Sequence, residues 1–382
     1  MVDKQYLITP GPTPIPPEVQ TAMAAPLIHH RSPVFRALLA DTVSGLQYVY
    51  QTANDVLVFA GSGTAAMESA VSNMTSPGDR VLVASAGNFG ERWLQLARAY
   101  ELDVVQVEQP WGERLDAAAV GEQASGCRVV YVTHSETSTG VVHDVRAIAD
   151  AVRPSGAALV VDAVSSLGGV ELATDEWGVD VVVAGSQKAL MTPPGLAFAS
   201  VSERAWELAA AARAPRYALD WGRTRTAQEK GDTPFTPPIS LLYGLRAAVA
   251  LIAERGLAAG FAHNRRLARA AREGVKALGL TLFSPDDASS AMVTAFQMPD
   301  GVDGQQVYAR LRDRFGIVLA GGQGPLRGRI VRIGHMGYMN EFDIITALSG
   351  LELALRGFGY RPAAAGAGAA RALEIFAEEG GG

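Results

Sequence analysis

Short apolar runs rich in β-branched residues alternate with amphipathic stretches over the first two thirds of the chain. Several of these runs are apolar at every position, which is typical of parallel strands covered on both faces of a sheet. They predict seven strands, at Val56–Ala60, Arg80–Ala84, Asp103–Val107, Arg128–Thr133, Ala157–Val161, Val179–Ala184 and Ala197–Val201. Helical stretches between them include Thr64–Asn73, Glu91–Tyr100 and Asp144–Val152. The alternation predicts an α/β domain with a mainly parallel seven-stranded sheet.

The pattern changes at a proline-rich stretch, Thr233–Ser240. It is followed by helical segments at Leu241–Arg255 and onward to Arg272, a strand at Met292–Gln297, a helix at Gly304–Phe315, a strand pair at Ile317–Ala320 and Ile330–Ile333, and a helix at Glu341–Leu355. This order predicts a smaller C-terminal α+β domain. We therefore divide the chain into an N-terminal arm (1–16), a large domain (17–245), a small domain (246–361) and an Ala- and Gly-rich tail (362–382) whose end we expect to be frayed.

Composition and charge exclude several classes of protein. The 382 residues are 48% hydrophobic and 19% charged, which excludes a disordered or coiled-coil chain. A net charge of -6 without a basic block argues against nucleic-acid binding. No apolar run is long enough to span a bilayer, and no signal peptide is visible. The single cysteine, Cys127, rules out an intrachain disulfide and a zinc site built on several thiolates. We expect a cytoplasmic protein that binds small molecules and no metal.

The lysines narrow the search for a nucleophile. Of the 33 Lys and Arg residues only four are lysines, and three of them, Lys4, Lys230 and Lys276, lie in polar surroundings typical of a surface. Lys188 instead follows a buried strand, at the sheet edge where open α/β sheets bind ligands. Partial burial would favour the neutral amine that forms a Schiff base with a carbonyl. On position alone, a structural lysine whose ammonium reaches solvent fits equally well.

Asp162 ends another apolar strand, 26 residues before Lys188. A carboxylate in that position is costly unless it has a cationic partner, and the protonated pyridine nitrogen of pyridoxal phosphate is one such partner. An Asp that caps the turn before Ser165–Ser166 is the alternative. An Asp and a Lys that each lie at a strand end together indicate a pyridoxal phosphate site far more specifically than either residue alone.

A glycine-rich turn, Gly61–Thr64, joins a strand to a helix and can bind an anion through backbone N–H groups. Its spacing to Ala66 also fits a dinucleotide-binding turn. That alternative requires an acidic residue at the end of the next strand, which instead ends in Ala84-Ser85. We therefore favour a single phosphate. Phe89, between Gly87 and Gly90, could stack on a flat cofactor or could simply belong to the core.

The motifs SGT, NFGER, THSETSTG, VDAVSSLGG and GSQKAL, in this order, resemble those of the class V aminotransferases, which are fold-type I pyridoxal phosphate enzymes. The alanine–glyoxylate and serine–pyruvate group is the most similar. The resemblance runs from LITPGPTPIPPEV to VRIGHMGY, which is nearly the whole chain. It implies the fold of the fold-type I transferases, pyridoxal 5′-phosphate as cofactor, and a homodimer with active sites at the subunit interface.

The resemblance also implies roles for individual residues. Lys188 would hold the cofactor as a Schiff base, and Asp162 would pair with its pyridine nitrogen. Val164 and Phe89 would cover the two ring faces, although the family often has the larger Trp at the position of Phe89. Thr137 would reach the ring-side oxygen. The phosphate would be bound by Ser62, Gly63, Thr64, Gln187 and the partner subunit's Thr236. Thr233 stands where the family often has a Tyr, which leaves a second phosphate contact open.

Two further features concern the substrate. By the same resemblance, Arg332 would bind the substrate α-carboxylate through two parallel hydrogen bonds, with backbone help from Gly11. If the family resemblance is set aside, a surface or interdomain salt bridge is the simpler interpretation of Arg332. His29-His30 does not suggest a metal site, since adjacent histidines rarely bind one ion. The similarity to phosphoserine aminotransferases leaves Arg31 either near a substrate side chain or at the dimer interface, and the role of His30 stays open.

The expected function is transfer of the amino group of alanine, serine or aspartate to glyoxylate or pyruvate in a ping-pong reaction. The cofactor would alternate between its pyridoxal and pyridoxamine forms. A transaminase resembling phosphoserine aminotransferase is the nearer alternative. A dinucleotide-dependent oxidoreductase and a protein without activity are the more distant ones. A cysteine desulfurase is disfavoured, because Cys127 opens a predicted strand instead of lying on a mobile loop.

Overall fold

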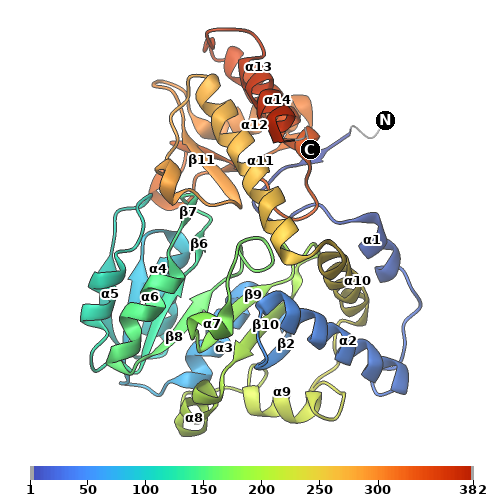
Figure 1. Ribbon diagram of the computed structural model, residues 1–382, viewed down its shortest axis with the longest axis vertical. Coiled ribbons are helices and arrows are strands. Elements are labelled where there is room, and N and C mark those ends of the chain that lie inside the picture. Colours follow the sequence, from blue (N-terminus) through green and yellow to red (C-terminus); the bar gives the residue numbers. More distant parts are fainter. Residues whose placement is uncertain (1–3, 380–382) are drawn as a thin grey trace.

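A seven-stranded sheet forms the centre of the larger part of the molecule in the computed structural model, which describes residues 4–379 (Figure 1). In spatial order the strands are β2 (Asp55–Gly61), β10 (Gly195–Val201), β9 (Val181–Gly185), β8 (Ala158–Asp162), β5 (Val129–Thr133), β3 (Arg80–Ser85) and β4 (Asp103–Glu108). Only β10 is antiparallel to its neighbours, β2 and β9. The prediction of seven strands in a mainly parallel sheet is confirmed.

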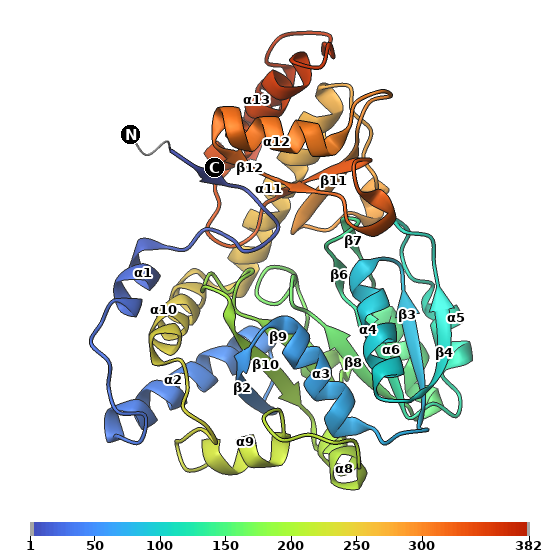
Figure 2. The same ribbon diagram turned by 180° about the vertical axis from the view of Figure 1, so that it is seen from behind.

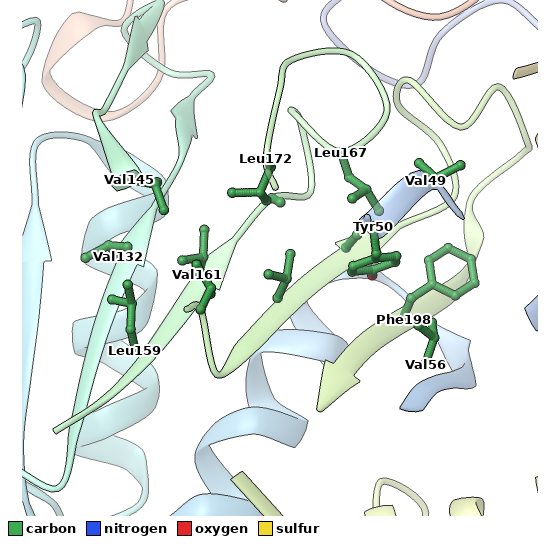
Figure 3. Close-up of a cluster of buried hydrophobic side chains, with 14 of the residues drawn as sticks. Val49, Tyr50, Val56, Val132, Val145, Leu159, Val161, Leu167, Leu172 and Phe198 are labelled. Carbon is green, nitrogen blue, oxygen red and sulfur yellow. The ribbon is translucent and has the colours of Figure 1, made fainter. Parts of the chain in front are cut away.

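Strand side chains alternate between two hydrophobic cores, one on each face of the sheet. In β5 and β8, Val132 and Val161 point into the core drawn in Figure 3, whereas Tyr131 and Val160 point into the other. Helices α2 (Pro33–Tyr50), α5 (Ala117–Gln123), α6 (Val145–Val152) and α10 (Ile239–Arg255) cover the first face. The opposite face, seen in Figure 2, is covered by α3 (Gly63–Met74), α4 (Asn88–Ala99), α8 (Glu203–Ala211) and α9 (Trp221–Gln228). Burial on both faces explains why the strands are apolar throughout.

Several helices begin at residues that the sequence marks as caps. Ser32 precedes Pro33 and accepts a hydrogen bond from the Phe35 N–H (3.2 Å) at the start of α2. Asp144 accepts one from the Ala147 N–H (2.9 Å) at the start of α6. These bonds satisfy amides that have no acceptor within their helices. The short elements α1 (Pro17–Met23), β6 (Ser135–Glu136), β7 (Val141–Val142) and α7 (Thr174–Trp177) complete the larger part.

The smaller part lies above the sheet in Figure 1 and is built on α11 (Leu257–Ala277). It contains the antiparallel sheet β11-β14-β13 and the helices α12 (Gly304–Phe315) and α13 (Glu341–Arg356). The strands are β11 (Val293–Gln297), β13 (Ala320–Gly321) and β14 (Ile330–Gly334). The predicted small α+β domain is therefore present as a unit with its own core.

One predicted strand pair is wrong in part. The segment predicted as a single strand, Ile317–Ala320, is divided into β12 (Ile317–Val318) and β13. β13 pairs with β14 as expected, but β12 pairs in parallel with β1 (Tyr6–Leu7) of the N-terminal arm. The arm is remote in sequence, so the local pattern could not reveal this partner.

The Ala- and Gly-rich tail contains a helix that the sequence pattern did not assign. α14 (Ala367–Glu379) packs against α11 and α13, and its Ala372 and Ile375 are fully buried. The frayed end predicted for the tail concerns residues 380–382, which lie outside the described residues. The small alanines and glycines of this segment give only a weak hydrophobic pattern, so the helix was not predicted. The same small residues allow α14 to approach Gly274 of α11 closely.

The proposed domain boundary at residue 245 falls inside α10, which runs unbroken from Ile239 to Arg255 and packs on α1 and α2. Gly256, with φ of 80°, separates α10 from α11. Glycine adopts this left-handed conformation at little cost. We therefore propose Gly256 as the boundary between the two domains.

We predict that Ile375→Ala lowers the free energy of unfolding by about 2–5 kcal/mol, because it opens a cavity in the small-domain core. Leu373→Ala on the same helix is the matched control, since Leu373 is 52% exposed. Urea denaturation of the full-length protein measures the change in the free energy of unfolding for both variants. Equal effects of the two substitutions would contradict the packing of α14.

Candidate active site

A cavity of about 250 Å³ opens at the carboxyl ends of the central strands. Its lining brings together ten of the residues predicted from the sequence: Gly11, Ser62, Gly63, Thr64, Phe89, Thr137, Asp162, Val164, Gln187 and Lys188. Parallel strands end at one edge of the sheet, and the register places Asp162 of β8 beside Val183 of β9, just ahead of the Lys188 turn. Residues distant in sequence therefore meet in one place, as expected for an open α/β sheet.

Lys188 lies in the turn that follows β9. Its Nζ donates a hydrogen bond to the carbonyl of Pro10 at 2.5 Å, and a Cβ at Gly11 would lie 2.5 Å from that Nζ. The N-terminal arm therefore touches the lysine and needs a glycine there, since Gly11 also has φ of 130°. Burial, reinforced by the nearby charge of Arg332, lowers the pKa of Lys188 to about 8. About a tenth of the amine is then neutral at pH 7, far more than for a lysine with an ordinary pKa.

Asp162 is 4% exposed and forms no ion pair with a described residue. Its Oδ1 accepts a hydrogen bond from the Val164 N–H at 2.8 Å. Burial raises the pKa of this carboxyl to about 6 and Glu136 increases the effect, while the Val164 hydrogen bond and the charges of Arg92 and Lys188 oppose it without forming an ion pair. A buried carboxylate without a cationic partner is unfavourable. The residue is therefore suited to a ligand that brings a positive charge.

The first turn of α3 forms an anion cradle at the other end of the cavity. The N–H groups of Gly63 and Thr64 have no acceptor within the helix, whereas that of Ala65 donates to the Ser62 carbonyl (2.9 Å), and the Ser62 hydroxyl does not cap the turn. A Cβ at Gly63 would lie 2.6 Å from Val164, so glycine allows the close approach of the turn. Gln187 also lines the cavity; its side-chain Nε2 is a possible donor, whereas its Oε1 is an acceptor without a partner in the described structure. The free backbone N–H groups and this amide N–H fit a phosphate group.

Arg92 is a cavity residue that we did not single out from the sequence, although it belongs to the NFGER motif. Its guanidinium lies 4.8 Å from the centre of the Phe89 ring, and its Nη1 donates to Thr64 Oγ1 at 3.2 Å. It adds a positive charge beside the anion cradle. Its position one helical turn after Phe89, on the same helix face, was the available signal.

Arg332 lies on β14 of the small domain; it is not among the residues that line the cavity, but it is bonded to Thr137, which is. Its Nη1 donates to the Thr137 carbonyl (2.7 Å), and its Nε and Nη2 donate to the Gly321 carbonyl (3.0 and 2.7 Å). Burial lowers the pKa of Arg332 to about 10, still well above neutrality, so it stays charged. These bonds use three of its five N–H groups and leave two for a ligand. Arg332 forms no ion pair with a described residue, so the salt-bridge interpretation does not hold.

The Thr137 hydroxyl lies 2.5 Å from Ser165 Oγ, within the loop that follows Asp162. Thr137 therefore faces the cavity as predicted, while its backbone carbonyl holds Arg332. One residue thus links the large domain, the small domain and the loop that carries Asp162 and Val164.

Thr236, predicted to bind the phosphate of the partner subunit's site, and Thr233, whose phosphate contact was left open, lie away from this cavity within one chain. Thr233 and Thr236 line a separate pocket beside β2, with Phe59 and Leu196. The Thr233 hydroxyl donates to the Phe235 carbonyl at 2.8 Å. Arg31 is likewise outside the cavity and lies 3.7 Å from Asp232. His29 and His30 stack on each other at 4.9 Å.

Comparison with known proteins identifies the family. The model of the family described as Aminotransferase class-V matches residues 5–341. The chain belongs to the class-V aminotransferases. Membership makes it a transaminase and implies pyridoxal phosphate as its cofactor, and the cavity offers a lysine, an unpaired buried carboxylate and an anion cradle that fit this group.

Relatives of the aminotransferase cover almost its full length. An L-aspartate–glyoxylate aminotransferase of Paracoccus denitrificans is 36% identical over 98% of this chain and 97% of its own. The solved structure of pyridoxamine–pyruvate aminotransferase from Mesorhizobium loti is 32% identical, with a TM-score of 0.94 over 99% of this chain and 98% of that one. The described fold is therefore shared from end to end.

A protein of Synechococcus named "Soluble hydrogenase, small subunit" is 44% identical over 98% of this chain and 99% of its own. The aminotransferase has one cysteine, Cys127, which is buried just before β5 and does not line the cavity. One thiolate cannot supply the set of cysteines that holds an iron–sulfur cluster. Among residues 4–379 no group of three or more His, Cys, Asp or Glu is placed to bind a metal, and no helix could cross a membrane.

We predict that Asp162→Asn stabilises the cofactor-free protein at pH 7.5 while it abolishes transamination. The raised pKa means that the folded state holds its proton more tightly than the unfolded state does. Wild-type stability therefore falls as the pH rises from about 4 to 6, and the loss amounts to at most about 3 kcal/mol.

Thermal melts of the cofactor-free wild type and variant test this prediction. The variant should melt at a higher temperature at pH 7.5, and the difference should close near pH 4. A variant that is less stable than wild type at pH 7.5 would show that the buried carboxylate carries no such cost.

Proposed function

We propose that the protein transfers the amino group of a small L-amino acid to glyoxylate or pyruvate, using pyridoxal phosphate bound in the Lys188 cavity. The observation that carries this proposal is the pairing of a partly neutral lysine with an unpaired buried aspartate in one cavity, beside a helix N-terminus with free amides. Each group matches one part of the cofactor: its aldehyde, its pyridine nitrogen and its phosphate.

Each residue then has a defined role. The N–H groups of Ser62, Gly63 and Thr64, with Gln187, would bind the phosphate, and Phe89 and Val164 would cover the ring. Asp162 would keep the pyridine nitrogen protonated. When bound, the cofactor supplies an electron sink for the charge left at Cα of the amino acid.

Lys188 would hold the cofactor covalently in the resting enzyme. Once the amino acid has displaced Lys188, its Nζ would take the proton from Cα as a general base. It would then return the proton on the cofactor side as a general acid. A pKa of about 8 suits both tasks near neutral pH, because the amine can accept a proton and release it.

Arg332 would bind the substrate carboxylate through its two remaining N–H groups. The bonds to Thr137 and Gly321 fix the guanidinium plane before the substrate arrives, which lowers the entropy lost on binding. Donors of the size of alanine, serine or aspartate and a glyoxylate or pyruvate acceptor agree with relatives named for aspartate, serine, glyoxylate and pyruvate. Arg31 lies outside the cavity within one chain, so within that chain no residue predicted to bind a phosphorylated donor lines the cavity.

We further propose a cytoplasmic homodimer, in which the partner subunit's Thr236 completes the phosphate site. Two aromatic side chains near Thr236 support this: Tyr217 is 64% and Phe235 43% exposed, with ring centres 5.7 Å apart. Exposed aromatic pairs are typical of interfaces. The single buried cysteine agrees with a reducing compartment.

We predict that Lys188→Ala eliminates the visible absorption band of the bound cofactor and all transamination, since no other lysine lines the cavity. Lys230→Ala, at an exposed position, is the control and should keep both. Absorption spectra after reconstitution and dialysis are the measurement. A wild-type protein that stays colourless after reconstitution would exclude the proposed cofactor.

We predict that Arg332→Lys raises KM for both the amino acid and the 2-oxo acid by at least about tenfold, because an ammonium cannot form two parallel bonds to a carboxylate. Arg327→Lys, also in the small domain but exposed, should leave KM unchanged. Steady-state kinetics over a panel of alanine, serine and aspartate would also rank the donors. An unchanged KM in Arg332→Lys would place the carboxylate elsewhere.

A further inference from the structure

Glu136 is a fully buried carboxylate that the proposed reaction does not use. It lies in β6, directly before Thr137, and belongs to the THSETSTG motif. It forms no ion pair with a described residue. A buried carboxylate is costly unless hydrogen-bond donors surround it, so its partners indicate its role.

All of its hydrogen-bond partners lie at the start of α4 or in its own turn. Oε2 accepts from the N–H groups of Phe89 (3.1 Å) and Gly90 (3.0 Å). Oε1 accepts from the N–H and the hydroxyl of Ser138 (3.2 and 2.5 Å). The Ser138 hydroxyl in turn accepts from the Asn88 N–H at 3.0 Å. Glu136 and Ser138 therefore satisfy three successive amides of the first turn of α4.

This arrangement replaces a local helix cap. The N-cap residue of α4 is Gly87, which has no side chain to offer. A Cβ at that position would lie 2.5 Å from the carboxyl carbon of Glu136, so the glycine makes room for a cap supplied 49 residues later in sequence. The carboxylate also faces the positive end of the helix dipole.

The helix start that Glu136 holds is the one that carries Phe89 and Arg92. Both side chains line the cavity, on a single helical turn. The next residue, Thr137, holds Arg332 through its carbonyl and Ser165 through its hydroxyl. The same turn therefore fixes the predicted stacking ring, the substrate-binding arginine and the loop after Asp162.

We propose that Glu136 is a positioning residue that clamps the N-terminus of α4 so that Phe89 and Arg92 face the cofactor. Its carboxylate acts through backbone amides and does not itself touch the ligand. The link to the cofactor rests on the proposed function, whereas the clamp on α4 is a property of the protein without cofactor.

The test compares wild type with Glu136→Gln and Glu91→Gln. Gln has the size of Glu, but one of its two terminal atoms is an amide nitrogen that cannot accept a hydrogen bond. The substitution therefore removes the hydrogen bonds to one of the two carboxylate oxygens. Glu91 is the matched control: it lies in the same helical turn, but its carboxylate accepts from Trp111 Nε1 (3.1 Å) and not from the amides of α4. Ser138→Ala removes the relay to Asn88 and leaves the carboxylate in place, which provides a milder variant if Glu136→Gln does not fold.

Two measurements are needed. Hydrogen–deuterium exchange of the cofactor-free protein, read on peptides covering residues 86–93, should speed up about tenfold in Glu136→Gln, less in Ser138→Ala, and not in Glu91→Gln. The Kd for pyridoxal phosphate, from titration of the cofactor-free protein, should rise about tenfold or more in Glu136→Gln, with a weaker circular dichroism signal of the bound cofactor.

Unchanged exchange in Glu136→Gln would overturn the clamp. Faster exchange with an unchanged Kd would overturn its role in positioning the cofactor residues. A wild-type protein that binds no pyridoxal phosphate would instead overturn the proposed function, and the exchange measurement would still report on the clamp.

Discussion

The site depends on keeping two buried ionisable groups together in a cavity at one edge of the sheet. Asp162 is held there without an ion pair to a described residue, and the Lys188 amine donates a hydrogen bond to the Pro10 carbonyl. Burial shifts their pKa values toward each other, to about 6 and about 8, so both come close to the physiological range. The cost of burying both groups is offset by the apolar cores on the two faces of the sheet, which fix the strands that carry them.

Around this pair, the structure is joined by contacts between segments far apart in sequence. The N-terminal arm reaches Lys188 through Pro10 and also pairs with β12 of the small domain. The turn at Glu136–Ser138 connects α4, Arg332 and the loop after Asp162. The cavity is thus lined by the large domain and the arm, and the small domain is tied to its lining through the hydrogen bond of Arg332 to Thr137.

The elements could be predicted where their pattern was local and strong. All seven central strands were recognised because burial on both faces makes them apolar throughout. The pairing of β12 with β1 and the helix α14 were not recognised, because the first needs a distant partner and the second has a weak pattern of small residues. Arg92 and Glu136 were within quoted motifs. The spacing of Arg92 from Phe89 was a signal that could have placed it in the cavity, but nothing in the position of Glu136 indicated that it would cap a helix.

The sequence by itself determined the α/β class, the position of Lys188 and Asp162 at strand ends, and the glycine-rich turn. Each of these follows from local hydrophobicity and turn chemistry. Only the tertiary structure decided that the two charges lack ion-pair partners, that Arg332 is held by carbonyls, and that α4 is capped by Glu136. Burial and hydrogen bonding between remote segments set these properties, and neither is encoded in the neighbouring residues. The scarcity of lysine pointed to one residue; the fold supplied its environment.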